Sequence, residues 1–333
     1  MARFAVQFKV QGWRLLPPDE VRNLYKTWRF QSVERAYHLL VPSLQEFLCT
    51  YSFDWVALLF SAAMALAYAA LVRRSKNTNR SWPIGRTIAF SVALGIYVWV
   101  NLGFFGTFSY LLRWAFTTRI ALLLFGIPLL IALGRPVDLA RQALAESGRA
   151  RLEAALKSWP IRLMGNAIFA PLFALAFFML FVTPLGGALR ESALAQNLIT
   201  VFAVLLGTLM ILPLTEREHH RSEIFIVGEF MIAFAELMLD AIPGVLLSIN
   251  NVILDHAPAA TGNLPAWFPT PMVDQHFSGN LLWMIAESVD IPILVMLFIR
   301  WGHSDRRAAK SIDDLSDEEF EALAQAHLRH RNR

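Results

Sequence analysis

Cysteine is almost absent from this sequence, since Cys49 is the single one among 333 residues. An intramolecular disulfide is therefore excluded, and there is no Cys-x-x-Cys pair of the kind that binds zinc or exchanges thiols. The sequence also lacks a phosphate-binding glycine loop, a nucleophile elbow and a zinc-protease motif. These absences remove the signals of the common enzyme classes, and we expect a protein that is not an enzyme.

Charged residues are scarce as well. They make up 17% of the chain, whereas apolar residues make up 56% and the mean hydropathy is +0.46. A soluble domain carries about a quarter charged residues, so this composition predicts a protein embedded in the lipid bilayer. The pI of 9.4 comes with a net charge of only +4 and no basic patch interleaved with aromatic residues. Cytoplasmic loops explain that excess better than nucleic acid does.

Long apolar stretches predict an all-α, polytopic membrane bundle with about seven transmembrane helices of roughly 20 residues each. An N-terminal segment, 1–52, precedes the bundle at 53–301, and a tail, 302–333, follows it. Pro243 and Gly244 are expected to end or kink the sixth helix, with the next residues continuing in the interface. The seven stretches lie near 53–72, 87–108, 113–134, 162–185, 194–213, 224–245 and 279–301.

Basic residues in the loops predict the orientation. The loops after the first, third and fifth stretches are rich in Lys and Arg, whereas the opposite side offers only Arg113 and Arg190. The positive-inside rule therefore places the N-terminus outside and the C-terminus in the cytoplasm. The seven basic residues within 1–52 disagree with this placement. Either part of that segment lies on the membrane surface as an amphipathic helix, or one span is misplaced.

Two extramembrane helices are expected on the cytoplasmic side. The loop at 135–158 has the pattern of a basic amphipathic helix held at the anionic leaflet. In the tail, Ser316 and Glu319 form a capping-box pattern before a short amphipathic stretch.

Five acids and one arginine lie inside the apolar stretches, away from their ends. Glu229, Glu236 and Asp240 recur at steps of seven and eleven, which brings them to within about 20° of one line on a helix. A charged side chain at mid-helix costs about 2.5–3.5 kcal/mol when it faces lipid, so this stripe is expected to face the bundle. The remaining members of the expected intramembrane polar network are Glu287 and Asp290 in the seventh stretch and Arg119 in the third.

The network has two interpretations, which the sequence leaves open. Arg119 is the natural protein partner for the acids, and Asp240 is expected in the matching half of the sixth helix. A buried ion-pair and hydrogen-bond network would order the helices, whereas a proton or cation site would use the same groups.

Copper is a further possibility on the outer side, where His256, His276 and Met272 offer imidazole and thioether donors. No pair of them stands at ligand spacing on a helix.

Three stretches of the sequence carry recognisable motifs: "LVRRSKNTNRSWPIGRTIAF", "LLLFGIPLLIALGRPVDLARQAL" and "MVDQHFSGNLLWMIAESVDIPILVMLFIRWGHSDRRAAK". The motif positions are Trp82, Arg86, Thr87, Pro128, Gly134, Pro136, Asp274, Gln275, Gly279, Trp283, Glu287, Pro292, Trp301, Asp305 and Arg307. With these motifs the sequence resembles the integral-membrane CtaG-type assembly factors of cytochrome c oxidase, and the likeness runs from about residue 40 to the end.

The resemblance implies a seven-helix bundle that helps to build the copper-containing oxidase, with a role in copper insertion. The sequence departs from the family at the histidines that the resemblance implies as copper ligands. Those positions hold Phe116 and Ile120, and the fifth stretch has no histidine. Phenylalanine and isoleucine cannot bind a metal. The fold and the oxidase partnership are expected to carry over, whereas copper binding by the usual ligands is not.

Two functions therefore remain. The first is an integral membrane protein that associates with cytochrome c oxidase subunits or a respiratory supercomplex, either as an assembly factor or as a retained accessory subunit. The second is a small proton or cation transporter that uses the acidic stripe. The sequence lacks the interrupted helices and inverted repeats of many transporters, so the first function is preferred.

Overall fold

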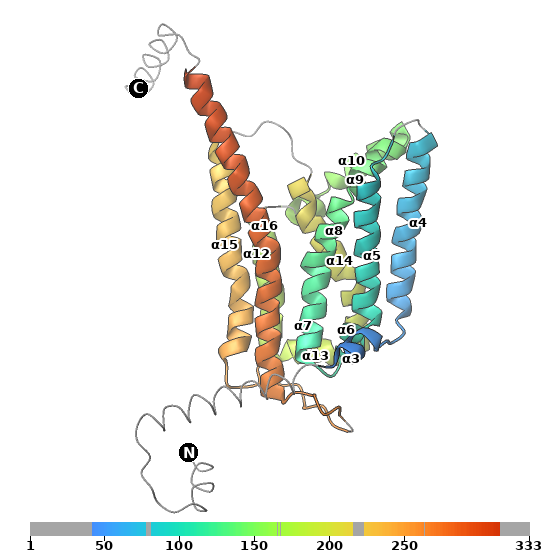
Figure 1. The fold of residues 1–333 in the computed structure, drawn as a ribbon, viewed down its shortest axis with the longest axis vertical. Coiled ribbons are helices and arrows are strands. Elements are labelled where there is room, and N and C mark those ends of the chain that lie inside the picture. Colours follow the sequence, from blue (N-terminus) through green and yellow to red (C-terminus); the bar gives the residue numbers. More distant parts are fainter. Residues whose placement is uncertain are drawn as a thin grey trace, which may run out of the picture.

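The structure is a computed structural model, and it describes residues 42–77, 81–164, 166, 168–215, 223–262 and 264–313. Every regular element within these residues is helical (Figure 1). The elements are α3 (Leu44–Cys49), α4 (Trp55–Asn77), α5 (Ile84–Leu102), α6 (Phe104–Phe108), α7 (Arg113–Ala121), the π-helical η1 (Leu122–Gly126), α8 (Ile127–Leu133), α9 (Pro136–Ala143), α10 (Glu146–Leu156), α11 (Trp159–Met164), α12 (Phe169–Met179), the 3₁₀ turn η2 (Leu180–Val182), α13 (Pro184–Glu191), α14 (Ala193–Thr215), α15 (Glu223–Ile249) and α16 (Pro271–Asp313).

Four helical stretches are long and apolar enough to cross a membrane: α4, α5 with α6, α7 through α8, and α14. A fifth is possible if α12 with η2 and α13, which meet at 85°, form one broken span. These elements confirm the predicted helical, apolar architecture. The sixth and seventh predicted stretches coincide with the long helices α15 and α16. The number of seven crossings and the orientation of the termini stay predictions.

The stretch from α7 to α8 forms the centre of the bundle. All nine residues of α7 are buried, and α16, α14 and α5 pack around this stretch. The π-helical segment η1 directly precedes α8, whose second residue is Pro128. Proline has no N–H and its ring clashes with the carbonyl four residues earlier, and a π-helical turn is one way to relieve that clash.

Several predicted boundaries differ from the structure. Helix α15 does not end at Pro243 and Gly244, but continues to Ile249. The expected single helix at 135–158 is broken between α9 and α10, because Leu144 and Ala145 have extended backbone. A capping box that was not among the predicted features begins α3, where the side chains of Ser43 and Glu46 each accept a hydrogen bond from the other residue's backbone N–H. The predicted surface helix before residue 42 and the tail helix at Ser316 lie outside the described residues.

Helices α15 and α16 pack against each other along their lengths, and the lower part of α16 also packs on α7 (Figure 1). The two helices approach each other closely at Gly279 of the predicted motif. A Cβ atom at Gly279 would overlap the carbonyl oxygen of Gly244 and lie 2.5 Å from Oγ of Ser248. Two helices can approach this closely only where small residues face each other. The motif glycine therefore sets the distance between α15 and α16.

We predict that Gly279→Ala lowers the thermal stability of the purified protein, because the added methyl group meets backbone atoms that cannot move aside. Overpacking of this kind costs about 1–3 kcal/mol. The control is Gly95→Ala in α5, where nothing lies within 4 Å of the added Cβ. Thermal unfolding in detergent should show a lower midpoint for Gly279→Ala and an equal or higher one for Gly95→Ala. Equal midpoints for both variants would contradict the close contact.

Candidate functional site

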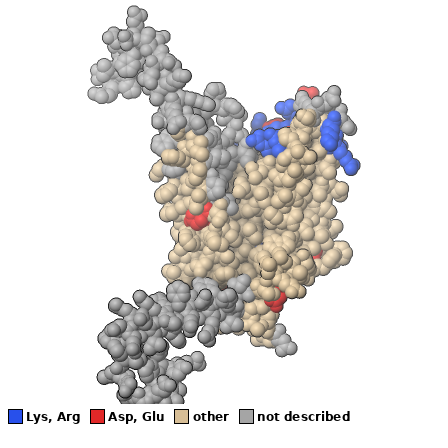
Figure 2. Space-filling view, viewed as in Figure 1, with Lys and Arg blue, Asp and Glu red and all other residues tan. Residues whose placement is uncertain are grey.

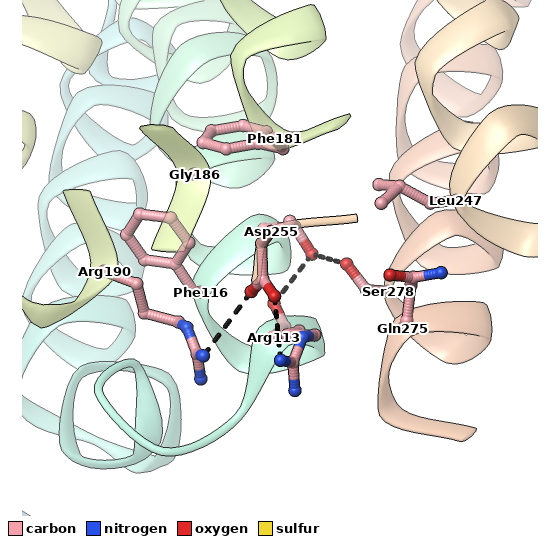
Figure 3. Close-up of a pocket in the computed structure, with 10 residues that line it drawn as sticks. Arg113, Phe116, Phe181, Gly186, Arg190, Leu247, Asp255, Gln275 and Ser278 are labelled. Carbon is pink, nitrogen blue, oxygen red and sulfur yellow. Dashed lines mark hydrogen bonds and ion pairs between the residues drawn. The ribbon is translucent and has the colours of Figure 1, made fainter. Parts of the chain in front are cut away.

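Four charged side chains are buried together at the end of the bundle where α7 begins. Arg113 Nη2 lies 2.8 Å from Oδ1 of Asp255, and Arg190 Nη2 lies 3.5 Å from the other oxygen of the same carboxylate. Arg113 also lies 3.5 Å from Asp274. Figure 3 shows the two arginines converging on Asp255 from α7 and α13. The cluster balances two positive charges with two negative ones, although its members come from four separate segments of the chain.

Asp274 has a second role at the start of α7. Its two carboxylate oxygens accept hydrogen bonds from the backbone N–H groups of Arg113 (2.8 Å) and Trp114 (3.0 Å). These N–H groups have no partner within their own helix, and the helix dipole favours a negative charge at this end. The carboxylate belongs to α16, so this cap comes from another helix. A motif residue identified only by resemblance therefore joins α16 to the central helix of the bundle.

Backbone groups complete the cluster. Arg113 donates to the carbonyl of Ala257 at 3.1 Å, and Arg190 donates to the carbonyl of Leu111 at 3.1 Å. The loop that carries Asp255 can lie against α13 because Gly187 has no side chain: a Cβ there would be 2.5 Å from the carbonyl oxygen of Asp255. Buried charges need such additional hydrogen bonds, because desolvation otherwise exceeds the attraction between the charges.

A small cavity lies beside the cluster (Figure 3). Its volume is about 20 Å³, measured as the space open to the centre of a water molecule, which is room for about one water. Thr117 and Ser278, whose hydroxyls are 2.7 Å apart, contribute polar atoms, and Phe116 and Phe181 contribute rings. Thus the position that the resemblance assigns to a copper ligand lines this cavity with a phenyl ring.

Gln275 orders the loop that follows α15. Its side-chain oxygen accepts from the N–H of Leu254 at 2.8 Å, and its amide nitrogen donates to the carbonyl of Val252 at 2.9 Å. Its neighbour His276 lies 2.9 Å from the carbonyl oxygen of Asn250. The adjacent motif residues Asp274 and Gln275 therefore fix two different segments, the start of α7 and the loop at 250–254.

Arg119 lies in the interior of the bundle with mostly neutral partners. Its guanidinium donates to Asn101 (3.0 Å), Gln196 (2.6 Å) and Thr200 (2.5 Å), and it lies 3.9 Å from the carboxylate of Asp54. These partners come from α5, α14 and the residue before α4. Gln196 also donates to the backbone carbonyl of Arg190 at 3.0 Å. The interior arginine and the buried cluster thus belong to one connected hydrogen-bond network.

The predicted acidic stripe can be placed only in part. Glu287 is half-buried, and its carboxylate accepts a hydrogen bond of 3.1 Å from the indole N–H of Trp283. The other predicted acids lie on α15 and α16 with side chains outside the described set, so their pairing with Arg119 stays a prediction. These acids are Glu229, Glu236, Asp240 and Asp290. The same holds for the motif residues Trp301, Asp305 and Arg307.

The first part of the family motif joins three helices at the other end of the bundle. The indole N–H of Trp82 donates to the hydroxyl of Tyr68 at 3.1 Å, and that hydroxyl donates to the carbonyl of Gly134 at 3.0 Å. The guanidinium of Arg86 lies 4.7 Å from the centre of the Trp82 ring, within cation–π distance. Pro136 then begins α9. These residues hold α4 and α5 against the end of α8.

The candidate copper ligands form no recognisable metal site. His256 is exposed with φ of 50°, and His276 and Met272 are half-buried. Among the residues that the structure describes, no group of three or more His, Cys, Asp or Glu side chains could hold a metal ion. Phe116 and Ile120 are buried, with 2% and 0% of their surface exposed. The residues present at these two positions therefore do not fit copper.

The fold and the site together define a helical protein with apolar, membrane-length helices and a buried ion-pair cluster at one end. Residues 66–304 match the family model described as cytochrome c oxidase caa3 assembly factor (Caa3_CtaG), and the chain belongs to this family. The match begins within α4 and ends within α16, so it covers almost the whole described bundle. No solved structure matches the chain.

Three curated proteins of mycobacteria are similar to this chain. Mb0105 of Mycobacterium bovis and MT0111 of Mycobacterium tuberculosis are each 25% identical over 298 residues, which are 84% of this chain and 44% of each relative. ML1998 of Mycobacterium leprae is 22% identical over 327 residues, which are 96% of this chain and 46% of that protein. The chain thus spans less than half the length of these relatives.

We predict that Asp274→Asn destabilises the protein strongly. The change removes one of two buried negative charges and leaves two arginines to share Asp255. Removing one partner of a buried ion pair costs about 3–5 kcal/mol. The control is Asp138→Asn, whose carboxylate is 39% exposed and lies 3.4 Å from Arg135; exposed pairs contribute about 0–1 kcal/mol. Thermal unfolding should separate the variants clearly, and similar midpoints would argue against the buried cluster.

Proposed function

We propose that this protein assists the assembly of a haem–copper cytochrome c oxidase in the bacterial plasma membrane. The family match over residues 66–304 carries this proposal, because it includes every helix of the described bundle from α5 to α15. The description of the family implies association with the oxidase. The membrane-length apolar helices support direct contact between this protein and an oxidase subunit within the bilayer. The family match does not support the transporter alternative.

The role does not depend on copper coordination at the two departing positions of α7. Phe116 and Ile120 are packed in the core, and α14 contains no histidine. The space beside Phe116 holds about one water, and it is surrounded by an already balanced cluster of arginine and aspartate. We therefore assign this chain a supporting role through contact with an oxidase subunit.

The outward face of α16 supports such contact. Met284 and Ile291, one turn to either side of Glu287, are exposed by 55% and 51%. These apolar side chains can face lipid without a free-energy cost. The half-buried carboxyl group of Glu287 beside them would be unfavourable in contact with lipid. Its described partner is the N–H of Trp283, a residue that is itself 46% exposed. A hydrogen-bond donor on an oxidase helix would satisfy the remaining capacity of Glu287.

We predict that deletion of the gene lowers oxidase activity and the amount of assembled oxidase in membranes, and that added copper does not restore either. Copper supplementation would bypass a protein whose task is to deliver the metal, but it cannot replace a protein contact. Oxidase spectra, oxidase activity and total copper content should be measured with and without the complementing gene. Full activity in the deletion strain would overturn the function. Rescue by copper alone would overturn the contact mechanism.

We predict that Glu287→Leu reduces recovery of oxidase subunits with the tagged protein at least about tenfold, because a buried polar contact between helices is lost. The thermal stability of the variant should stay equal or rise, since a carboxyl group leaves an apolar face. Glu146→Gln, an acid in the first turn of α10, serves as the control and should leave recovery unchanged. Unchanged recovery with Glu287→Leu would contradict the proposed face.

A further inference from the structure

A second hollow lies at the opposite end of the bundle from the buried cluster. Its volume is about 230 Å³, against about 20 Å³ for the cavity beside Phe116. It lies between the end of α8, the short helices α9 to α11 and the last turns of α14. The lining residues are Ala132, Arg135, Pro136, Val137, Asp138, Leu156, Ile161, Thr208, Leu209 and Leu212.

The lining is apolar except at one edge. Apolar side chains from α9, α11 and α14 form most of the wall. The hydroxyl of Thr208 donates a hydrogen bond to the carbonyl of Val204 at 2.7 Å. The charged members, Arg135 and Asp138, lie next to each other at the start of α9. Val137 and Leu209 are half-buried, so the wall reaches the surface of the bundle. An apolar hollow with a charged edge suits an amphipathic ligand.

The surroundings of the hollow are strongly basic. Figure 2 shows Lys and Arg side chains gathered at this end of the molecule. Residues 73–86 and 135–162 contain eleven basic residues and three acidic ones. Two of the three acids are already engaged, since Arg141 lies 3.6 Å from Asp138 and donates to Glu153 at 2.7 Å. The hydrogen bond from Arg141 lowers the pKa of Glu153, which therefore stays ionised and paired. The excess of positive charge remains for an anionic partner.

Tryptophan at this end of the bundle favours a position of the hollow near the lipid headgroups. Trp82 and Trp159 lie at this end of the bundle, and Trp159 is 68% exposed. Tryptophan concentrates where hydrocarbon meets headgroups, with its ring in the apolar layer and its N–H in the polar one. The positive-inside rule assigns this end to the cytoplasm, where anionic lipids attract basic residues.

Arg135 is held at the edge of the hollow by its backbone. Its φ of 45° and ψ of 55° lie in the left-handed region of backbone conformation, which residues other than glycine rarely adopt. Its side chain is 49% exposed and 3.4 Å from Asp138. Strained positions of this kind persist where the surrounding structure fixes them, often at ligand contacts. The guanidinium is thus available to a phosphate, while the apolar wall starts beside it.

We propose that this hollow binds one acyl chain of an anionic phospholipid, and that Arg135 with the basic residues around it binds the phosphate. Basic pockets between membrane helices are known to select lipid headgroups by charge. The apolar lining would receive the chain, while the tryptophans hold the site at the correct depth. The bound lipid would fill the gap between α14 and the α9–α11 connection and so fix that connection against the bundle.

The test measures lipids retained by the purified protein in native mass spectrometry, with phosphatidylglycerol and phosphatidylcholine of identical chains as probes. The unmodified protein should retain phosphatidylglycerol preferentially. Arg135→Asn removes the charge but keeps a residue that tolerates the left-handed backbone, and it should weaken retention about fivefold, as expected for one basic residue near lipid. Arg149→Asn, an equal change in charge on the exposed face of α10, should have a smaller effect. Equal retention of both lipids, or equal effects of both variants, would overturn the proposal.

The hollow itself is tested by Val137→Trp, which fills the space without changing charge. This variant should lose the tightly held phosphatidylglycerol. In case it fails to fold, a phosphatidylglycerol with a photoreactive acyl chain can be crosslinked to the unmodified protein. Labelled peptides should come from α9, α11 or α14. The proposed site would be contradicted if the lipid labelled no peptide of these helices. It would also be contradicted if the hollow were found to be occupied by residues 314–333 of the chain and not by lipid.

Discussion

The buried attraction between Arg113 and the carboxylates of Asp255 and Asp274 is the interaction on which the arrangement of the bundle depends. It joins the first turn of α7, the loop after α15 and the first turn of α16, and Arg190 adds α13. Each charge is costly to bury alone, so removing a single member should weaken the contact between these segments. Asp274 also caps the first turn of α7, because its carboxylate accepts hydrogen bonds from the backbone N–H groups of Arg113 and Trp114. The same carboxylate therefore holds both the ion pair and the start of the helix.

The two ends of the bundle use charge in opposite ways. At one end the charges are balanced and buried, and Gln196 connects them to the interior Arg119. At the other end basic residues outnumber acidic ones and face outward, around an apolar hollow. Between them, Phe116 and Ile120 fill positions where the family resemblance implies copper ligands. The proposed contacts with lipid and with the oxidase rest on this distribution of charge.

Much of the fold could be predicted because hydropathy is a local property: the stretches expected near 53–72, 113–134 and 194–213 coincide with apolar, membrane-length helices. The cluster could not be predicted, because Arg113 and Asp255 are 142 residues apart. The sequence indicates Arg113 only as a charge of the outer side, and Asp255 belongs to none of its motifs. The partners of Arg119 were missed for a different reason. Asn101, Gln196 and Thr200 are neutral and leave no charge pattern in the sequence. Asp274 and Gln275 were recognised only through the family resemblance.

A double-mutant cycle between Arg113 and Asp274 tests the central interaction most directly. Thermal unfolding would be measured for Arg113→Leu, Asp274→Asn and the double variant. Each single change leaves an uncompensated charge, whereas the double change removes one charge of each sign. The double variant should therefore lose less unfolding free energy than the two single variants lose together. The difference is the interaction energy, and it should lie in the upper part of the usual range of about 0.5–3 kcal/mol. Strictly additive effects would contradict the account.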